Sequence, residues 1–161
     1  KMLNFNAIKI YKLSNKLYKR NYKRLSYMVD KINLILRNSS IPGSCEIGEN
    51  TRIAYGGIGV VIHAEAKIGK NCMIGQGITL GKQLGKVGVP EIEDNVYIAA
   101  GVRIIGKIKI GHDSIIAPNS VVIKDVEPYS IYSGIPARKI NSITKTNIEK
   151  YRVYGIQNYE E

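Results

Sequence analysis

The sequence predicts an all-β solenoid, a parallel β-helix of hexapeptide repeats, with an N-terminal helical segment before it and a short C-terminal tail or helix after it. Three observations lead to this fold class. Aliphatic residues recur at every sixth position, glycine and asparagine gather between them, and most of the net charge of +11 lies in residues 1–40. A period of six fits neither an α-helix nor simple strand alternation, and it is typical of repeat architectures.

The period of six runs through three phased blocks. Its positions are Ile41, Ile47, Ile53, then Ile62, Ile68, Ile74, Leu80, then Ile92, Ile98, Ile104, Ile110, Ile116 and Val122. Each hexapeptide is predicted to form one short strand and one corner, and three hexapeptides complete a triangular coil. The aliphatic side chains then point inward and stack on their equivalents in the neighbouring coils, which builds a continuous core.

Glycine and asparagine are expected at the corners, because glycine has no Cβ and asparagine tolerates the left-handed region. The candidates are Gly48, Asn50, Gly69, Asn71, Gly75, Asn95, Gly101, Gly111 and Asn119. They predict where the chain turns from one side of the triangle to the next.

Two breaks in the period predict excursions from the coil. Nine residues separate Ile53 from Ile62, so "AYGGIGVV" is expected to bulge outward. Twelve separate Leu80 from Ile92, and the missing core position would fall on Lys86. Burying a lysine is costly unless it is paired, so we predict that 81–91 forms a protruding loop. Such loops on rigid scaffolds tend to carry binding groups.

Residues 1–40 carry ten Lys or Arg against one acid, Asp30. An apolar stripe at spacings of three and four predicts an amphipathic helix, formed by Tyr18, Tyr22, Leu25, Val29, Ile32 and Leu36. Either the basic face contacts an acidic or lipid-linked glycan at a membrane surface, or the stripe docks on an oligomer. Nucleic-acid binding is not favoured, because the tyrosines lie on the stripe and no reader motif occurs.

Segment boundaries and location follow from the same composition. We expect a basic helical segment at 1–40, the β-helix at 41–140 and a tail or short helix at 141–161. No membrane span or signal sequence is evident, so a cytoplasmic location is expected, with the inner membrane face as a possible peripheral site. The spacing of Cys45 and Cys72 suggests no metal site or disulfide, and both are predicted to be buried thiols.

The hexads, read with "VVIKDV" and "SGIPARKI", resemble the left-handed β-helix acyltransferases of the hexapeptide family. The resemblance runs from about residue 41 to 140 and is strongest to the serine acetyltransferase-like branch with its sugar O-acetyltransferases. It implies left-handed coiling, a homotrimer, and acetyl-CoA bound in grooves between neighbouring solenoids. No metal is implied.

The resemblance assigns the CoA-binding residues by position. "IAAGVRIIG" is similar to the family's I-G-A-G-A-K-I-L-G, which places Ala100 and Gly101 along the pantetheine arm, with Pro118 in the next coil. "IGQGITLG" is similar to the segment before the protruding loop and retains Gly81, but Lys82 replaces the glycine that normally follows.

Three basic residues are expected near the CoA phosphates. Lys124 matches the lysine of the family's V-x-K-D-V motif, and Arg138 and Lys139 lie close enough in sequence to join it. Fixed cations suit a multiply charged phosphate. The alternative for each is a solvated surface charge.

Acetyl transfer to a hydroxyl needs a general base. The family's two histidine motifs are changed here, with Tyr55 and Ala54 at the first and Val89 at the second. His63 follows the bulge and is the candidate base, with Tyr55 as an assisting or substrate-orienting hydroxyl; His112 is expected at the surface. The alternatives are a structural histidine and a packed tyrosine ring.

These features predict an acetyl-CoA-dependent O-acetyltransferase acting on a hydroxyl of a sugar or surface-polysaccharide precursor. The changed histidine motifs count against L-serine as the acceptor. The alternative is a serine acetyltransferase-like protein that has lost turnover and acts as a CoA-binding or structural trimer. The acyl chain is left open by the sequence.

Overall fold

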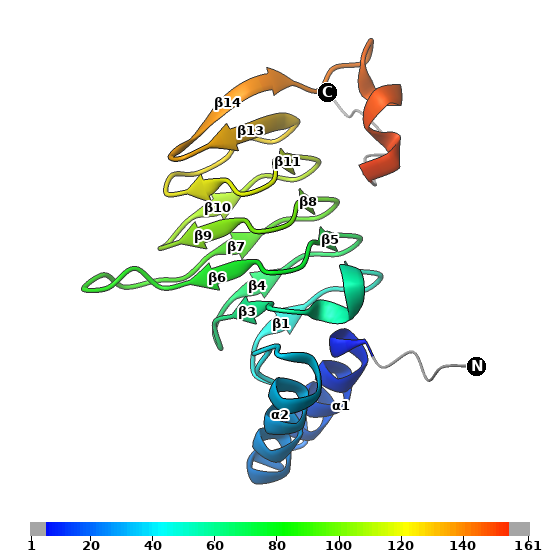
Figure 1. Ribbon diagram of the computed structural model, residues 1–161, viewed down its shortest axis with the longest axis vertical. Coiled ribbons are helices and arrows are strands. Elements are labelled where there is room, and N and C mark those ends of the chain that lie inside the picture. Colours follow the sequence, from blue (N-terminus) through cyan, green and yellow to red (C-terminus); the bar gives the residue numbers. More distant parts are fainter. Residues whose placement is uncertain (1–5, 155–161) are drawn as a thin grey trace.

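The computed structural model describes residues 6–154. Helices α1 (Ala7–Lys19) and α2 (Lys23–Arg37) stand at one end of a solenoid of short strands, and the 3-10 segment η2 (Ile148–Tyr154) follows the last strands (Figure 1). The division into segments at residues 40 and 140 stays a prediction.

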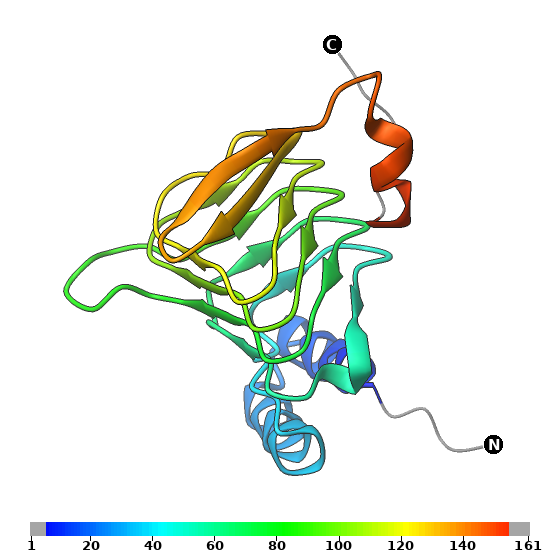
Figure 2. The ribbon, with the colours of Figure 1, turned by 45° about the horizontal axis from the view of Figure 1, so that its top comes forward.

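Three parallel sheets form the sides of the triangle (Figure 2). The first side contains β1 (Glu46–Ile47), β4 (Lys67–Ile68), β7 (Glu91–Ile92) and β10 (Lys109–Ile110). The second contains β2 (Arg52–Ile53), β5 (Met73–Ile74), β8 (Tyr97–Ile98), β11 (Ile115–Ile116), β13 (Ser130–Gly134) and the antiparallel β14 (Ala137–Ser142). The third contains β3 (Val61–Ile62), β6 (Thr79–Gly81), β9 (Arg103–Ile105) and β12 (Val121–Val122). We name the corners by the sides they join: corner 1–2, corner 2–3 and corner 3–1.

The predicted core is confirmed. Twelve of the thirteen sixth-residue aliphatics are at most 4% exposed, and Ile47 in the first coil is half-buried. They stack in register from coil to coil, as Ile74, Ile98 and Ile116 do on the second side. Each coil therefore buries its aliphatic residues only by having a neighbour above and below.

The corner residues divide into two physical groups. Asn50, Asn71, Asn95 and Asn119 have φ between 55° and 58°, the left-handed conformation predicted for them. Gly75, in contrast, has no positive φ: a Cβ there would lie 2.5 Å from the backbone nitrogen of Ala100 in the next coil. The predicted reason for a glycine was therefore wrong at such corners, where close approach between coils excludes a side chain. The same holds for Gly48, Gly69 and Gly111.

Gly75→Ala is expected to destabilise the protein by roughly 1–3 kcal/mol, because the added methyl group overlaps backbone that cannot move without separating two coils. Gly77→Asn is the matched control: Gly77 has φ +65° and open space where a Cβ would lie, and asparagine tolerates that conformation. Urea unfolding of both variants tests this. Equal midpoints would show that the coils can separate at low cost.

The N-terminal segment differs from its prediction. Asn21, at φ 63°, ends the first helix, so Tyr18 and Tyr22 do not share a helix with Leu25. Ala7, Ile8 and Tyr11 of α1 pack into the end of the solenoid core, and Tyr11 donates a 2.8 Å hydrogen bond to the carbonyl of Cys45. No residue of α2 belongs to that core cluster, and the predicted stripe is largely exposed. None of the described helices has the length and apolar content needed to cross a membrane.

Cys45 and Cys72 are free, buried thiols, as predicted. Burial raises the pKa of Cys72 from 9.0 to about 11 and that of Cys45 to about 12, because both thiolates would be poorly solvated. The two thiols therefore act as small core side chains that stay protonated at neutral pH.

Folding stability is expected to fall between pH 9.0 and about 11 because of Cys72. In this window the unfolded chain releases the thiol proton while the folded chain keeps it, so unfolding is favoured by up to about 1.4 kcal/mol per pH unit. Urea unfolding of wild type and Cys72→Ala at several pH values isolates this effect from other titrating groups. Identical pH dependence in both proteins would contradict it.

Candidate functional site

Predicted site residues gather at corner 2–3. Tyr55, Ala100, Gly101 and Pro118 lie on this corner in the first, third and fourth coils, between the strands of the second and third sides. The corner is a column of turns with little side-chain bulk, so an extended ligand could lie along it against the backbone.

The predicted bulge lies at the first level of this corner. Tyr55 (φ 48°) and Gly56 (φ 72°) turn the chain outward within η1 (Ala54–Gly57), which leaves the Tyr55 side chain 77% exposed. Gly57 faces the helical segment, where a Cβ would lie 2.5 Å from Cβ of Ala7. The tyrosine hydroxyl is thus held out from the body of the solenoid on a turn packed against α1.

Backbone hydrogen bonds tie the levels of corner 2–3 together. Gly101 N–H donates to the Gln76 carbonyl at 2.9 Å, and Asn119 N–H donates to the Ala100 carbonyl at 2.9 Å. The Arg103 guanidinium, on the third side, reaches back and donates to the Gly101 carbonyl at 3.1 Å. Sequence reasoning missed Arg103; its place as the outward residue just after the glycine corner was the available signal.

Corner 3–1 carries the second group, His63, the protruding loop and Lys124. The loop leaves the third side after Gly81 and rejoins the first side at Glu91, as predicted, and it projects from the solenoid (Figure 2). Its apolar side chains Leu84 and Val87 are 100% and 88% exposed. Nothing in the described chain covers them.

His63 lies directly beside the base of this loop, because its N–H donates to the Leu80 carbonyl at 2.9 Å. Its Nδ1 accepts a 3.2 Å hydrogen bond from the Glu65 N–H. The neutral ring in this arrangement carries its proton on Nε2, so the half-buried imidazole presents a donor at that nitrogen.

The two candidate catalytic residues, His63 and Tyr55, do not lie side by side within one chain. Tyr55 lies at corner 2–3 and His63 at corner 3–1, with β3 between them. Figure 2 shows the η1 turn and the protruding loop on opposite parts of the cross-section. One repeat spans one side of the triangle, so residues eight apart in sequence are separated by a whole side.

The three basic residues are not gathered into one cluster. Lys124 and Arg138 are exposed and form no ion pair with any other residue in the 6–154 range. Lys139 Nζ lies 2.6 Å from Glu127 Oε2, and this hydrogen bond raises the lysine's pKa. Lys124 follows the third side, whereas Arg138 and Lys139 lie on β14 of the second. Their joint role at the CoA phosphates stays a prediction.

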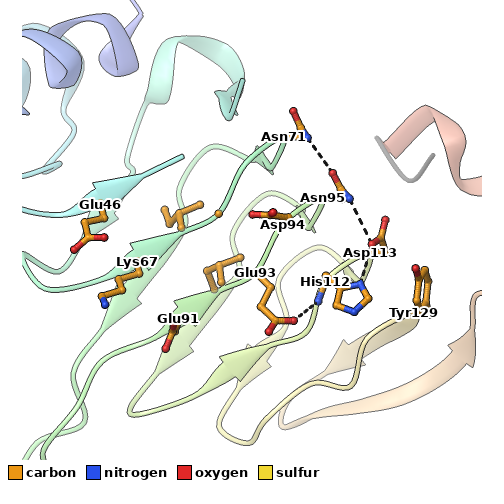
Figure 3. A pocket seen from close by; sticks show the side chains of 13 residues that line it. Glu46, Lys67, Asn71, Glu91, Glu93, Asp94, Asn95, His112, Asp113 and Tyr129 are labelled. Atoms are coloured by element: carbon orange, nitrogen blue, oxygen red, sulfur yellow. Dashed lines mark hydrogen bonds and ion pairs between the residues drawn. The ribbon is translucent and has the colours of Figure 1, made fainter. Parts of the chain in front are cut away.

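A hollow of about 690 Å³ lies elsewhere, along the first side and corner 1–2 (Figure 3). Its charged lining consists mainly of acids: Glu46, Glu91, Glu93, Asp94 and Asp113, with Lys67 and His112. None of the predicted catalytic or CoA-binding residues lines it. Over residues 6–154, no group of His, Cys, Asp and Glu has the arrangement of a metal site.

His112 lines this hollow at corner 1–2, where its side chain is 42% exposed, in keeping with the surface position expected for it. Its Nδ1 lies 2.9 Å from Asp113 Oδ2, which also accepts a 3.4 Å hydrogen bond from Asn95 (Figure 3). The backbone N–H of His112 donates to Oε2 of Glu93 at 2.8 Å. Burial opposes ionisation of Glu93, but the bonds from Lys109 and from this N–H outweigh it and lower the pKa.

Comparison with known proteins places this geometry in a family. The model of the bacterial transferase hexapeptide family (six repeats) matches residues 90–124. Serine acetyltransferase of Bacillus subtilis is 35% identical over 138 residues, which is 84% of this chain and 63% of the relative. Serine acetyltransferase of Staphylococcus xylosus is 37% identical over 81% of this chain and 61% of its own. The chain therefore spans about three fifths of the length of these relatives.

Solved structures of serine acetyltransferases superimpose on this chain. Serine acetyltransferase from Brucella abortus strain S19, in complex with coenzyme A, superimposes with a TM-score of 0.81 at 30% identity, over 86% of this chain and 56% of that one. The Neisseria gonorrhoeae enzyme in complex with serine gives 0.79 at 30% identity, over 84% and 55%. The fold is thus a left-handed parallel β-helix.

Over most of its length the chain is similar to hexapeptide-repeat acyltransferases with this fold. Within that family, the relatives it resembles are named serine acetyltransferases. The prediction of a sugar or surface-polysaccharide acceptor is contradicted by these relatives. The changed histidine motifs, which counted against L-serine, are two short segments, whereas the similarity to proteins named serine acetyltransferases extends over most of the chain.

Proposed function

We propose that this protein transfers the acetyl group of acetyl-CoA to the hydroxyl of L-serine. The observation that carries the proposal is its 35–37% identity, over more than four fifths of the chain, to proteins named serine acetyltransferases. The protruding loop and the column of turns at corner 2–3 supply the two surfaces that such a reaction needs: one for the acceptor and one for a long cofactor arm.

The proposed site is completed by a second copy of the chain. Corner 2–3, with Tyr55 and Gly101, lies at the opposite end of the third side from corner 3–1, with His63 and the loop. If corner 3–1 of one copy packs against corner 2–3 of the next, both groups meet across the contact. Such a head-to-tail contact closes into a ring, and a homotrimer is the ring we propose.

In this site acetyl-CoA lies along corner 2–3 with its pantetheine arm against Ala100, Gly101 and Pro118. Gly101 is needed at this turn for packing between coils, since a Cβ there would lie 2.1 Å from Oδ1 of Asn119. Lys124 lies at corner 3–1 and its charge is unpaired by any described neighbour. We assign it to the phosphates, which it would reach from the neighbouring copy in the proposed ring, and Arg138 is a second candidate.

The reaction requires one proton acceptor. The serine oxygen attacks the acetyl carbon, its proton moves to the base, and the C–S bond breaks to release CoA, whose thiolate takes the proton from the base. We assign the base to Nε2 of His63. To accept a proton at Nε2, the neutral ring must carry its resting proton on Nδ1, which breaks the hydrogen bond from the Glu65 N–H. Losing that bond costs about 1 kcal/mol. This cost is smaller than the barrier reduction behind the 10²–10⁴-fold rate acceleration that a general base typically gives. The Tyr55 hydroxyl is assigned to orienting the acceptor.

The test is release of the CoA thiol from acetyl-CoA on addition of L-serine, with O-acetylserine identified by mass spectrometry. Lys124→Ala is expected to raise KM for acetyl-CoA roughly tenfold, because a charge-assisted contact to phosphate is lost. Lys67→Ala, which removes an exposed lysine from the first side, is the matched control and should leave KM unchanged. Absence of product with L-serine, in a preparation that binds CoA, would overturn the proposal.

A further inference from the structure

Helix α2 packs with its polar face inward. Ser26 Oγ lies 2.7 Å from Ser14 Oγ of α1, and Ser14 also donates to Asp30 Oδ1 at 2.6 Å. Asn33 donates to the Ala7 carbonyl at 3.2 Å. Ser26 and Asn33 are the buried residues of α2. Hydrogen bonds between small polar side chains thus join this helix to the rest of the chain.

The apolar residues of α2 consequently point away from the protein. Ile35 is 80% exposed and Met28 60%. The other exposed apolar side chains of this helix are Leu25, Tyr27, Ile32, Leu34 and Leu36. Leu25, Met28, Ile32 and Ile35 recur at spacings of three and four and therefore form one apolar stripe along the helix, and an exposed stripe of this kind indicates a docking site.

Basic residues share this surface, and no free acid opposes them. Lys23, Arg24, Lys31 and Arg37 are the charged residues of α2 apart from Asp30. The Asp30 carboxylate is turned inward, where it accepts from Ser14 and from the Gly43 N–H at 3.1 Å. The neighbouring helix α1 adds further lysines and no acid. The exposed surface of the helical pair is therefore apolar and positive.

This surface lies at the end of the solenoid, not along its sides. Figures 1 and 2 place α1 and α2 at the end where the chain begins, with α1 between α2 and the coils. Copies that pack side by side through their corners would carry their α2 helices at the same end of the assembly. The α2 surface is thus separate from the proposed acetyl-transfer site.

We propose that α2 docks on an anionic lipid bilayer. Aliphatic side chains such as Ile35 and Met28 would insert at the level of the acyl boundary while Arg24 and Lys31 contact lipid phosphates, the arrangement of interfacial amphipathic helices. A second copy of the same face is disfavoured, because it would bring like charges together without compensating acids. Nucleic acid is a poorer fit, because aliphatic side chains offer no surface for stacking bases.

The experiment is co-sedimentation of the full chain with vesicles of phosphatidylcholine alone or mixed with phosphatidylglycerol. We expect binding only to the mixed vesicles, weakened by added salt. Met28→Ser/Ile35→Ser should weaken it about tenfold, and Arg24→Gln/Lys31→Gln should weaken it and reduce its salt dependence. All four residues are on the outer surface of α2, so circular dichroism should be unchanged.

Leu84→Ser/Val87→Ser is the matched control, since it removes two apolar side chains that are almost fully exposed on the loop. It should bind vesicles as wild type does. The proposal is overturned if wild type does not distinguish the two vesicles, or if the Met28/Ile35 variant binds as wild type. It is also overturned if that variant instead lowers the mass of the assembly by light scattering with vesicle binding unchanged, which would identify a second copy as the occupant.

Discussion

His63→Ala is expected to lower kcat for acetyl transfer to L-serine by roughly 10²–10⁴-fold, the contribution of a general base. Since His63 is assigned to the proton and not to the cofactor, the dissociation constant of CoA should change little. The side chain is half-buried at a corner and makes one hydrogen bond, to Glu65 N–H, so the fold should survive its removal. Steady-state kinetics and calorimetric titration with CoA measure the two quantities.

His112→Ala is the matched control, because it removes the other histidine of the chain at corner 1–2, away from the proposed site. It should retain kcat. If His63→Ala turns over at the wild-type rate, the base has been assigned wrongly, whatever the acceptor. Tyr55→Phe, which keeps the ring and removes the hydroxyl, should raise KM for L-serine more than it lowers kcat if Tyr55 orients the acceptor.

Ile98→Ala is expected to lower the free energy of unfolding by about 2–5 kcal/mol. Ile98 is fully buried at the centre of the second side, between Ile74 and Ile116 of the adjacent coils, so its truncation leaves a cavity that both neighbours line. Because a solenoid is stabilised mainly by contacts between adjacent coils, one cavity weakens two such contacts. Urea unfolding followed by circular dichroism measures the change.

Ile140→Ala provides the comparison, because this β14 residue is 63% exposed and its removal opens no cavity. Its effect should stay within about 0.5 kcal/mol. Similar losses for the two variants would mean that the stacked aliphatic column does not dominate stability.

The repeat could be predicted because it depends on local order along the chain. Every sixth residue meets its equivalent in the next coil, so Ile68, Ile92 and Ile110 occupy one column as their spacing implies. The loop after Gly81 was predictable for the same reason, since Lys86 could not occupy a core position. Asparagines at corners were predictable because their backbone preference is a property of the residue itself.

Contacts between repeats were harder to predict from the sequence. The need for glycine at Gly75 comes from the backbone of the following coil, and the placement of Arg103 over the Gly101 carbonyl depends on how two coils align. The apolar stripe on α2 was predictable from its spacing, but the inward-facing side of the helix was not, because it depends on hydrogen bonds that Ser14 and Asn33 make between elements.

The sequence by itself determined the coil, its core column, the bulge and the protruding loop, since each of these follows from spacing within a repeat whose geometry is constant. Only the tertiary structure decided which corners carry Tyr55 and His63, and which face of α2 is turned outward. The first outcome depends on where each side of the triangle ends, and the second depends on which side chains of α1 and α2 form hydrogen bonds with each other. The period of six predicts neither.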